Sequence, residues 1–260
     1  MRLAGVRRDL RLVARQVYYE QLAFWRNPFG AIFTIGFSVI FLLLLASSAS
    51  ARLRQIGDIR AVQYYVPGFA AYGVMSACFN TLAVNLVGRR ETGLLKRLRL
   101  SPLPTWALLA GIFCNLILIS ALQVALLLMI GHFAYGALLP RNVGAFVLAL
   151  AAGVVCFSAL GVAVSSLLPN QEAAGPIIGI VYFVLLFLSG LWFYLPPRSG
   201  LARVADYFPV RHFLLAVQAP FEFQAKVSPW SFGDLAALLV WGAAATAVAL
   251  RRFRWEPRHH

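Results

Sequence analysis

Residues 89–104 form a short basic segment between two long apolar runs. On a helix over residues 89–101, Leu94, Leu95 and Leu98 fall on one side, while the charged residues point elsewhere. Gly93 permits a sharp turn before this stripe, and two prolines end the helix before the next apolar run. The basic side chains are Arg89, Arg90, Lys96, Arg97 and Arg99, and the prolines are Pro102 and Pro104. This pattern suits binding rather than catalysis: it fits a docking helix for a cytoplasmic partner or a loop that binds lipid phosphates.

Residues for other kinds of chemistry are missing from the apolar runs. The nine acids and four histidines lie in loops or near the ends of these runs, which gives no proton or sodium relay. The sequence has no Gly-x-x-x-x-Gly-Lys-Ser/Thr loop for nucleotide phosphates and no His/Glu or Cys/His cluster for a metal. The intramembrane serines have no histidine near their depth, so an intramembrane hydrolase is disfavoured.

Composition assigns the chain to integral membrane proteins. Of its 260 residues, 61% are hydrophobic and 12% are charged, against about 45–50% and 25% in soluble domains. Several apolar runs approach or exceed the roughly 20 residues that cross a bilayer, and such spans must be helical. We therefore expect an all-α protein with one membrane-spanning domain over residues 29–250, which the resemblance described below makes a permease domain. Its six predicted spans are 29–49, 64–87, 105–130, 143–167, 174–195 and 232–250.

Basic residues predict the orientation. Of the 23 Lys and Arg residues, 15 lie on the side that holds both ends of the chain and eight on the other. The positive-inside rule therefore places both termini in the cytoplasm, in the inner membrane of the cell. Anionic lipid headgroups beside these loops also explain the net charge of +14, so nucleic acid is not expected as a partner. The run 46–51 resembles a signal-peptidase site, but the long apolar stretch before it favours an uncleaved span.

Three further segments outside the spans have recognisable patterns. Residues 1–28 predict an amphipathic helix in the headgroup plane, with Leu10, Val13, Val17 and Leu22 on one side; a flexible basic tail is the alternative. Residues 196–231 are rich in proline and aromatic residues, so we expect either short re-entrant helices in the outer leaflet or packing over the outer ends of the spans. Residues 251–260 form a basic cytoplasmic tail.

The string from Arg89 to Leu98, followed by Ser101-Pro102-Leu103, resembles the cytoplasmic motif of type-2 ABC exporter permeases. That group includes drug-resistance, polysaccharide-export and lipid-export permeases. Their pattern is approximately Arg-Glu-x-Gly-Thr-Leu-x-Arg-Leu, then Pro-Leu, and Leu94 stands where Thr is usual. The resemblance covers nearly the whole chain, including the six spans, the stretch 189–193 and the stretch 207–212.

The resemblance implies that residues 89–101 are a coupling helix seated in a cleft of a separate ATP-binding subunit. Two permease chains, identical or different, and two ATPase subunits would form one exporter in membrane lipid. ATP and Mg would be bound and ATP hydrolysed by the partner, so this chain would carry no cofactor, metal or catalytic residue. The expected ATPase contacts are Arg89, Arg90, Glu91, Gly93, Leu94, Leu95, Lys96, Arg97, Leu98 and Pro102.

Transport would follow a path at the interface of two permease chains, lined chiefly by the second and fifth spans. The expected lining residues are Phe69, Tyr72, Met75, Phe79, Tyr182, Phe183, Phe187 and Phe193. The segment near 196–215 would gate the exit, through Pro196, Pro197, Tyr207, Phe208 and Pro209. An aromatic lining suits a drug-like or lipid-like substrate more than a sugar polymer, although the same aromatics could instead face lipid or pack between helices. The alternatives are a polysaccharide-export permease and a membrane anchor that recruits a partner without transport.

Overall fold

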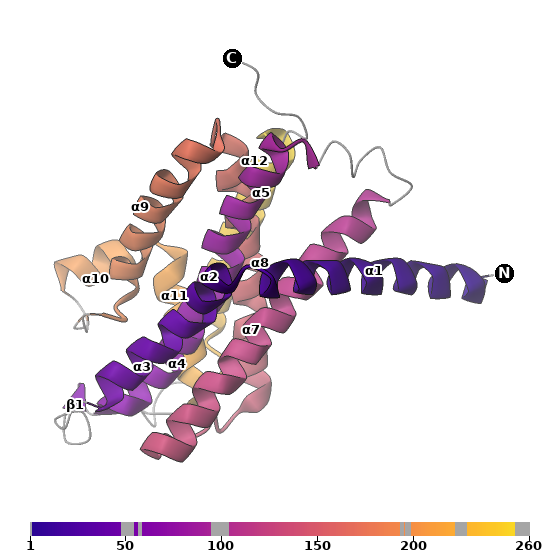
Figure 1. The fold of residues 1–260 in the computed structure, drawn as a ribbon. Helices are drawn as coiled ribbons and strands as arrows, with labels where there is room; N and C mark the ends of the chain where they lie inside the picture. Colours follow the sequence, from indigo (N-terminus) through magenta and orange to yellow (C-terminus); the bar gives the residue numbers. More distant parts are fainter. Residues whose placement is uncertain are drawn as a thin grey trace.

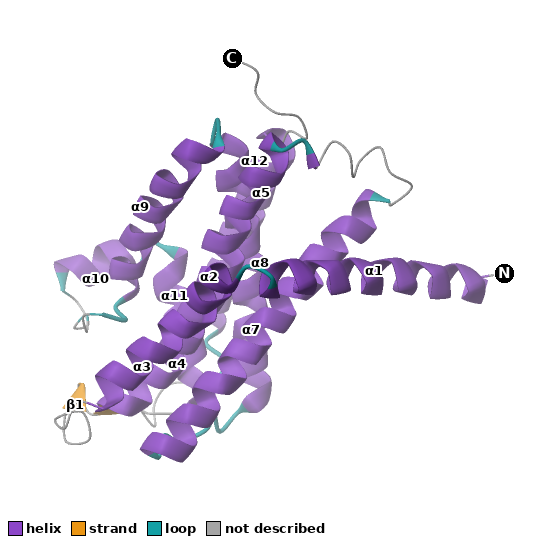
Figure 2. Ribbon diagram, viewed as in Figure 1, coloured by secondary structure: helices purple, strands orange, loops and turns teal. Residues whose placement is uncertain are grey.

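The computed structural model describes residues 2–47, 55–56, 59–94, 104–192, 195, 199–221 and 228–252. The regular secondary structure of this part of the chain is helical apart from one antiparallel pair of two-residue strands, β1 (Gln55–Ile56) and β2 (Ile59–Arg60) (Figure 2). Six helical stretches are long and apolar enough to cross a membrane: Pro28–Ser47, Ala61–Glu91, Trp106–Tyr135, Val143–Leu167, Gln171–Ser189 and Phe232–Arg252. The all-α class with six spans is therefore confirmed.

The first two spans are each built from several helical segments. The first joins α2 (Pro28–Ala31), the π-helix η1 (Ile32–Gly36) and α3 (Phe37–Ser47). The second joins α4 (Ala61–Met75), the π-helix η2 (Ser76–Thr81) and α5 (Leu82–Glu91). The remaining helices are α1 (Arg2–Trp25), α7 (Thr105–Tyr135), α8 (Val143–Leu167), α9 (Gln171–Ser189), α10 (Gly200–Ala205), α11 (Pro209–Gln218), the 3₁₀ turn η3 (Ala219–Phe221) and α12 (Phe232–Arg252).

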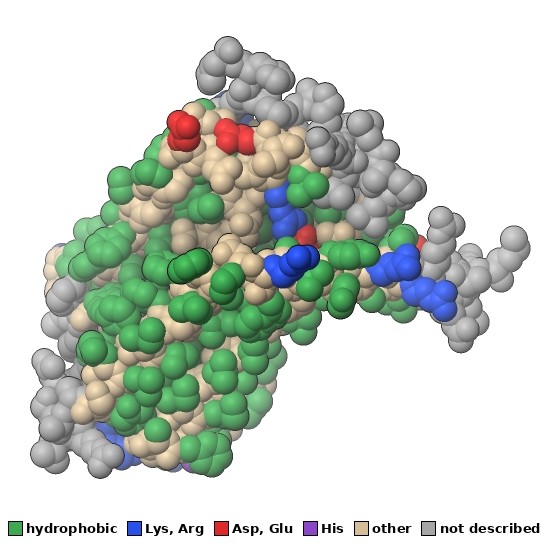
Figure 3. All heavy atoms as spheres, viewed as in Figure 1, with side chains coloured by type: hydrophobic (Ala, Val, Ile, Leu, Met, Phe, Trp, Pro, Cys, Tyr) green, Lys and Arg blue, Asp and Glu red, His purple; other side chains and the backbone are tan. Residues whose placement is uncertain are grey.

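The second span is the centre of the bundle. In its apolar window 78% of residues are buried, against 44% or less in every other span. It contacts α3, α7, α8, α9 and α11, so its side chains form much of the core (Figure 1). The other spans leave large apolar side chains exposed, and Figure 3 shows this hydrophobic surface over the face that carries α3 and α7. An apolar exterior is what a bilayer requires of a spanning bundle.

Helix α1 crosses the bundle instead of running along it (Figure 1). It packs on α7, where Gly111 lies against the side chain of Gln16. The side of α1 that faces the protein carries Gln16 and the buried Glu20, whereas Leu10 and Leu22 of the expected apolar side are exposed. Val13 and Val17 of the same side are half-buried, and the placement of this apolar side in the headgroup plane stays a prediction.

Three span ends shift by four or more residues from the sequence expectation, and one of them is the end of the third span, which lies at Tyr135 instead of residue 130. The second span extends past residue 87 to Glu91, so Arg89 and Arg90 lie on the same continuous helix. The fifth was expected to reach residue 195 but ends at Ser189, because Gly190 adopts φ +85°, a left-handed conformation that terminates helices. Tyr64 at the start of α4 donates a hydrogen bond of 2.6 Å to the Gly190 carbonyl and fixes this corner.

The chain after α9 returns into the bundle as short helices. Helix α11 packs on α4, α8, α9 and α12, and most of its side chains are buried. His212 joins it to the start of α12: its Nδ1 lies 2.7 Å from Asp234, and its Nε2 lies 2.8 Å from the Asp206 carbonyl. The two expectations for this segment, re-entrant helices and packing over the outer ends of the spans, both stay predictions.

Two glycines of α8 set the spacing of its neighbours. Gly161 lies against the backbone of η2, where an added Cβ would be 2.9 Å from the Cys78 carbonyl oxygen. Gly153 receives the ring of Phe213 from α11, so closely that no Cβ fits. Small residues permit close helix approach where no hydrophobic force between helices assists packing.

We predict that Gly153→Ala lowers stability, because the added methyl group must displace the buried Phe213 ring. Overpacking of this kind costs about 1–3 kcal/mol. The thermal unfolding midpoint in detergent should fall clearly below that of the wild-type chain. The control is Gly233→Ala on α12, where an added Cβ meets nothing within 4 Å and the midpoint should hold. Equal midpoints for the two variants would contradict this packing.

Candidate functional site

The structure describes the first half of the basic segment, from Arg89 to Leu94. Helix α5 ends at Glu91, and the Thr92 amide and hydroxyl both donate to the Gly88 carbonyl at 3.0 Å. Gly93 follows with φ +69°, a left-handed conformation that favours glycine, so the chain turns there as the sequence predicts. The rest of the expected ATPase contacts lie outside the described residues: Leu95, Lys96, Arg97, Leu98 and Pro102.

Arg89 binds helix α1 through a bidentate ion pair. Its Nη1 and Nη2 donate to the two Glu20 carboxylate oxygens at 2.6 and 2.5 Å. Gln16 donates a further hydrogen bond of 2.9 Å to Glu20 from one turn earlier on α1. The two charged side chains are only 21% and 8% exposed, so solvent screens this pair less than a surface pair. Arg89 therefore joins α5 to α1 across 69 residues of sequence.

Arg90 points in a different direction and enters the protein. Its residue is 3% exposed, and its guanidinium donates to the carbonyl oxygens of Ser165, Leu168 and Pro169 at 3.2, 2.5 and 3.2 Å. These carbonyls are at the C-terminal end of α8 and in the turn to α9, where helix geometry leaves acceptors without intrahelical donors. The partial negative charge of a helix C-terminus also favours a cation there. Arg90 thus joins α5 to the α8–α9 turn.

The remaining described residues of the segment are more accessible. Glu91 is half-buried, and Leu94 is 40% exposed. Beside them, Gly88 of α5 lies against Gln171 at the start of α9. The segment therefore has two different sides. Arg89 and Arg90 hold it to α1, α8 and the α8–α9 turn, while Glu91 and Leu94 lie nearer the surface.

The expected path residues separate into two sets. Phe69, Tyr72, Met75, Phe79 and Tyr182 are buried and belong to the core. The Tyr182 ring of α9 lies 5.8 Å from that of Tyr72 and stacks at 6.4 Å on that of Phe79, measured between centroids. A cavity beside Tyr72 and Met75 has a volume of only about 10 Å³, too small for a substrate. In this conformation these side chains pack the second span against the fifth.

The second set lies on the outer side of α9. Phe183 and Phe187 are 59% and 40% exposed, and their ring centroids are 4.8 Å apart. Of the expected gate residues, Tyr207 is exposed, Phe208 is half-buried, and Pro209 is buried in the first turn of α11. Phe193 of the expected path and Pro196 and Pro197 of the expected gate lie outside the described residues.

The described residues of the basic segment link helices to one another through hydrogen bonds and an ion pair. Within the described ranges, no group of three or more His, Cys, Asp or Glu side chains could hold a metal ion. The charged contacts of Arg89 and Arg90 connect α1, α8 and the α8–α9 turn to the end of the central span. Residues 54–251, more than half of the chain, match the family model described as ABC-2 family transporter protein.

The chain belongs to the ABC-2 transporter family. It is 26% identical over 156 residues to the probable multidrug ABC transporter permease YbhR of Escherichia coli strain K12, and equally to YbhR of E. coli O157:H7. The alignment covers 58% of this chain and 41% of each relative, so the match spans about two-fifths of their length. The resemblance found in the sequence is therefore confirmed at the level of the family.

Sequence reasoning missed one residue of this ABC-2 site, Glu20. It is the one acid between Arg11 and Arg26 of a basic stretch, which was a signal available in the sequence. Its partner lies 69 residues away, and nothing in the local pattern pairs the two. Arg89 and Arg90 were both expected to contact an ATPase subunit, and the structure shows each of them making contacts within the chain.

We predict that Glu20 and Arg89 are energetically coupled. A double-mutant cycle with Glu20→Gln and Arg89→Gln, measured by unfolding in detergent, should give an interaction energy of about 1–3 kcal/mol, because each single change leaves a shielded charge without its partner. The control pair is Asp206 and Arg211, 3.9 Å apart with an exposed carboxylate, where coupling should be below about 1 kcal/mol. Strictly additive effects of the two Gln substitutions would refute the coupling.

Proposed function

We propose that the chain is the membrane permease subunit of an ATP-driven exporter that moves a hydrophobic or amphipathic substrate out of the cytoplasm or the inner leaflet. One observation carries the proposal: the basic segment continues the central span and is bonded through Arg89 and Arg90 to α1, to the end of α8 and to the α8–α9 turn. A force applied to this segment would reach α1, α8 and the turn that leads into α9 directly. A transporter without an ion relay needs an external energy source, and this segment is the point where a partner would deliver it.

The energy source is a separate ATP-binding-cassette subunit, which binds ATP and Mg. The sequence of this chain has no phosphate-binding loop of the Walker type. The more accessible side of the segment, with Glu91 and Leu94, is the docking surface for this subunit. An effector shifts a conformational equilibrium only through its different affinities for the two states. The ATPase contacts at Glu91 and Arg97 therefore change with the bound nucleotide.

The second permease chain packs on α9. An added Cβ at Gly175 or Gly179 meets nothing within 4 Å, so the chain itself leaves this small-residue side uncovered. Ile180, Phe183 and Val184 are exposed on the same helix. Closely spaced glycines suit a helix that packs against another helix. The substrate path forms at this interface when the stacking of Tyr182 on α4 and η2 rearranges during alternating access, and both termini lie in the cytoplasm.

We predict that Glu91→Ala and Arg97→Ala uncouple the exporter. Each variant should fold and reach the membrane but lose the rise in ATP turnover that a hydrophobic substrate causes. The measurement is ATP hydrolysis by the chain and its copurified ATPase in lipid nanodiscs, with and without substrate. Full substrate-stimulated turnover in both variants would refute the assignment of the segment.

Matched controls change the same residue types elsewhere. Glu172→Ala alters the exposed acid in the first turn of α9, and Arg252→Ala alters a basic residue at the end of α12. Both should retain stimulated turnover. If the copurified partner has no nucleotide-binding loops, the export proposal fails and the chain is a membrane anchor.

A further inference from the structure

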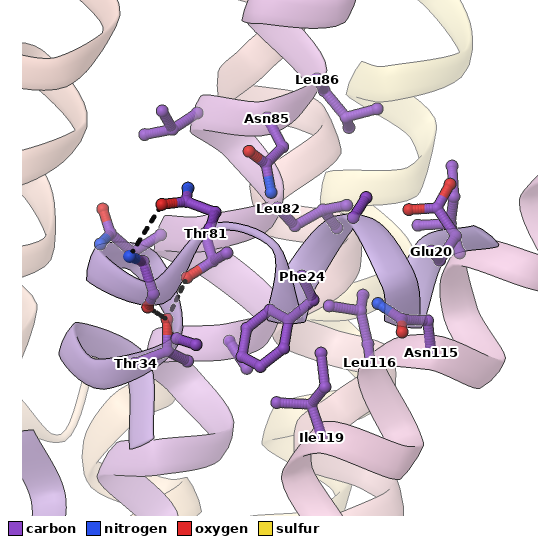
Figure 4. Close-up of a pocket in the computed structure, with 18 of the residues that line it drawn as sticks. Glu20, Phe24, Thr34, Thr81, Leu82, Asn85, Leu86, Asn115, Leu116 and Ile119 are labelled. Carbon is purple, nitrogen blue, oxygen red and sulfur yellow. Dashed lines mark hydrogen bonds between the residues drawn. The ribbon is translucent and has the colours of Figure 1, made fainter. Parts of the chain in front are cut away.

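A cavity of about 310 Å³ lies where α1 crosses the bundle. It is bounded by α1, the first two spans and α7, and it is distinct from the aromatic residues discussed above. Figure 4 shows Thr34 and Thr81 facing each other on one side, Asn115 and Glu20 on the other, and the Phe24 ring between them. The walls are apolar, with Leu82, Leu86, Ile112, Leu116 and Ile119 among them.

Uncharged hydrogen-bonding side chains line part of the cavity and indicate a ligand with hydrogen-bonding groups. Three asparagines that belong to two of the spans line the cavity: Asn80, Asn85 and Asn115. Asn115 is 93% buried, since its exposure is 7%, and its Oδ1 accepts no hydrogen bond from the described part of the chain. An unsatisfied buried acceptor costs about 1–3 kcal/mol. A donor inside the cavity would remove that cost.

The two π-helices meet at this cavity. Thr34 belongs to η1, and Asn80 and Thr81 belong to η2, and the two threonine hydroxyls are 3.3 Å apart. π-Helical turns are rare and occur frequently at functional sites, because the extra residue redirects side chains. Here both irregular turns direct polar groups of a membrane span into one space, which regular packing of the two helices would not require.

Charge and size restrict the ligand further. Glu20 and Arg89, the two charged residues of the lining, neutralise each other through their bidentate pair. A ligand with a full charge would find no counter-charge there. The volume lies near the lower end of the roughly 300–1,000 Å³ of small-molecule sites. It holds a head group and the first carbons of a tail, and the tail can continue past Phe33, which lines the cavity and is 56% exposed.

We propose that this cavity binds the head group of an amphiphile with an uncharged, hydroxyl-bearing head, such as a glycerol monoester. A ligand hydroxyl donates to Asn115 Oδ1, the asparagine and threonine side chains on the other walls complete its hydrogen bonds, and the tail runs into the bilayer. Such amphiphiles are the substrate class of the exporter, a point that rests on the proposed function.

The test compares three probes with the same twelve-carbon tail: monolauroylglycerol, laurate and dodecyltrimethylammonium. Binding to the full chain in lipid nanodiscs is measured by equilibrium dialysis, without an ATPase subunit. We expect monolauroylglycerol to bind at least about tenfold more tightly than the two charged probes, which corresponds to about 1.4 kcal/mol. Equal binding of all three probes, or no binding because the cavity holds only water, would overturn the proposal.

Two variants and a matched control locate the site. Asn115→Leu should weaken monolauroylglycerol binding about tenfold, the effect of one hydrogen bond to a buried acceptor. Thr34→Val should weaken it as well, whereas Thr246→Val should not. The last two are matched, because each threonine hydroxyl donates to the carbonyl four residues earlier at 2.8 Å and only Thr34 lines the cavity. If Asn115→Leu does not fold, the two threonine variants decide: equal binding by both would refute the site.

A separate measurement addresses the substrate class. Monolauroylglycerol should raise ATP turnover of the assembled exporter, and Thr34→Val should reduce that rise. Binding without stimulation would overturn the substrate class and leave the site to a resident membrane lipid. Loss of stimulation by every hydrophobic substrate would instead count against the exporter itself, and the binding result would stand.

Discussion

The structure depends on how one buried cation is satisfied. Arg90 ends the central span inside the protein, where an unpaired guanidinium would be prohibitively unfavourable. The carbonyls of Ser165, Leu168 and Pro169 provide the acceptors, and they are available because α8 ends there. The free carbonyls at the end of α8 and in the turn to α9 thus accept the hydrogen bonds of the Arg90 guanidinium at the end of α5. The positions of α5, α8 and α9 therefore depend on one another.

The neighbouring Arg89 extends this junction to α1. Its bidentate pair with Glu20 holds a helix that crosses the bundle and otherwise packs mainly on α7. At the opposite end of the same span, Tyr64 donates to the carbonyl of Gly190 after α9. The central span is therefore bonded to the α8–α9 turn at one end and to the end of α9 at the other. A displacement of the basic segment along this span would act on both ends of α9, the helix whose outer side carries Gly175, Gly179 and Phe183.

Polar side chains within the spans also form hydrogen bonds to neighbouring helices. Gln123 of α7 donates to the Thr34 carbonyl at 2.9 Å and to the Ser38 hydroxyl at 2.6 Å, so it binds the first span at the π-helix η1. Gly73 of α4 leaves room for the Gln123 side chain. Nearby Asn115 faces the cavity beside α1 instead of a neighbouring helix. Polar side chains within membrane spans are energetically costly and usually have a role. The role of Gln123 is to bind the first span, whereas Asn115 is available to a molecule in the cavity.

The sequence alone determined the class, the six spans, the turn at Gly93 and the family, because bilayer thickness and a local motif are encoded in contiguous residues. It predicted the second span but not its central place, and it named Arg89 and Arg90 without their partners. Tertiary structure decided those partners, since Glu20 and Ser165 are 69 and 75 residues away and a guanidinium satisfies any suitably placed acceptor. It also decided which side of α1 is buried, where α9 ends, and that Thr34, Thr81 and Asn115 surround one cavity. Helical periodicity shows which residues share a side, but only packing selects the side that faces the protein.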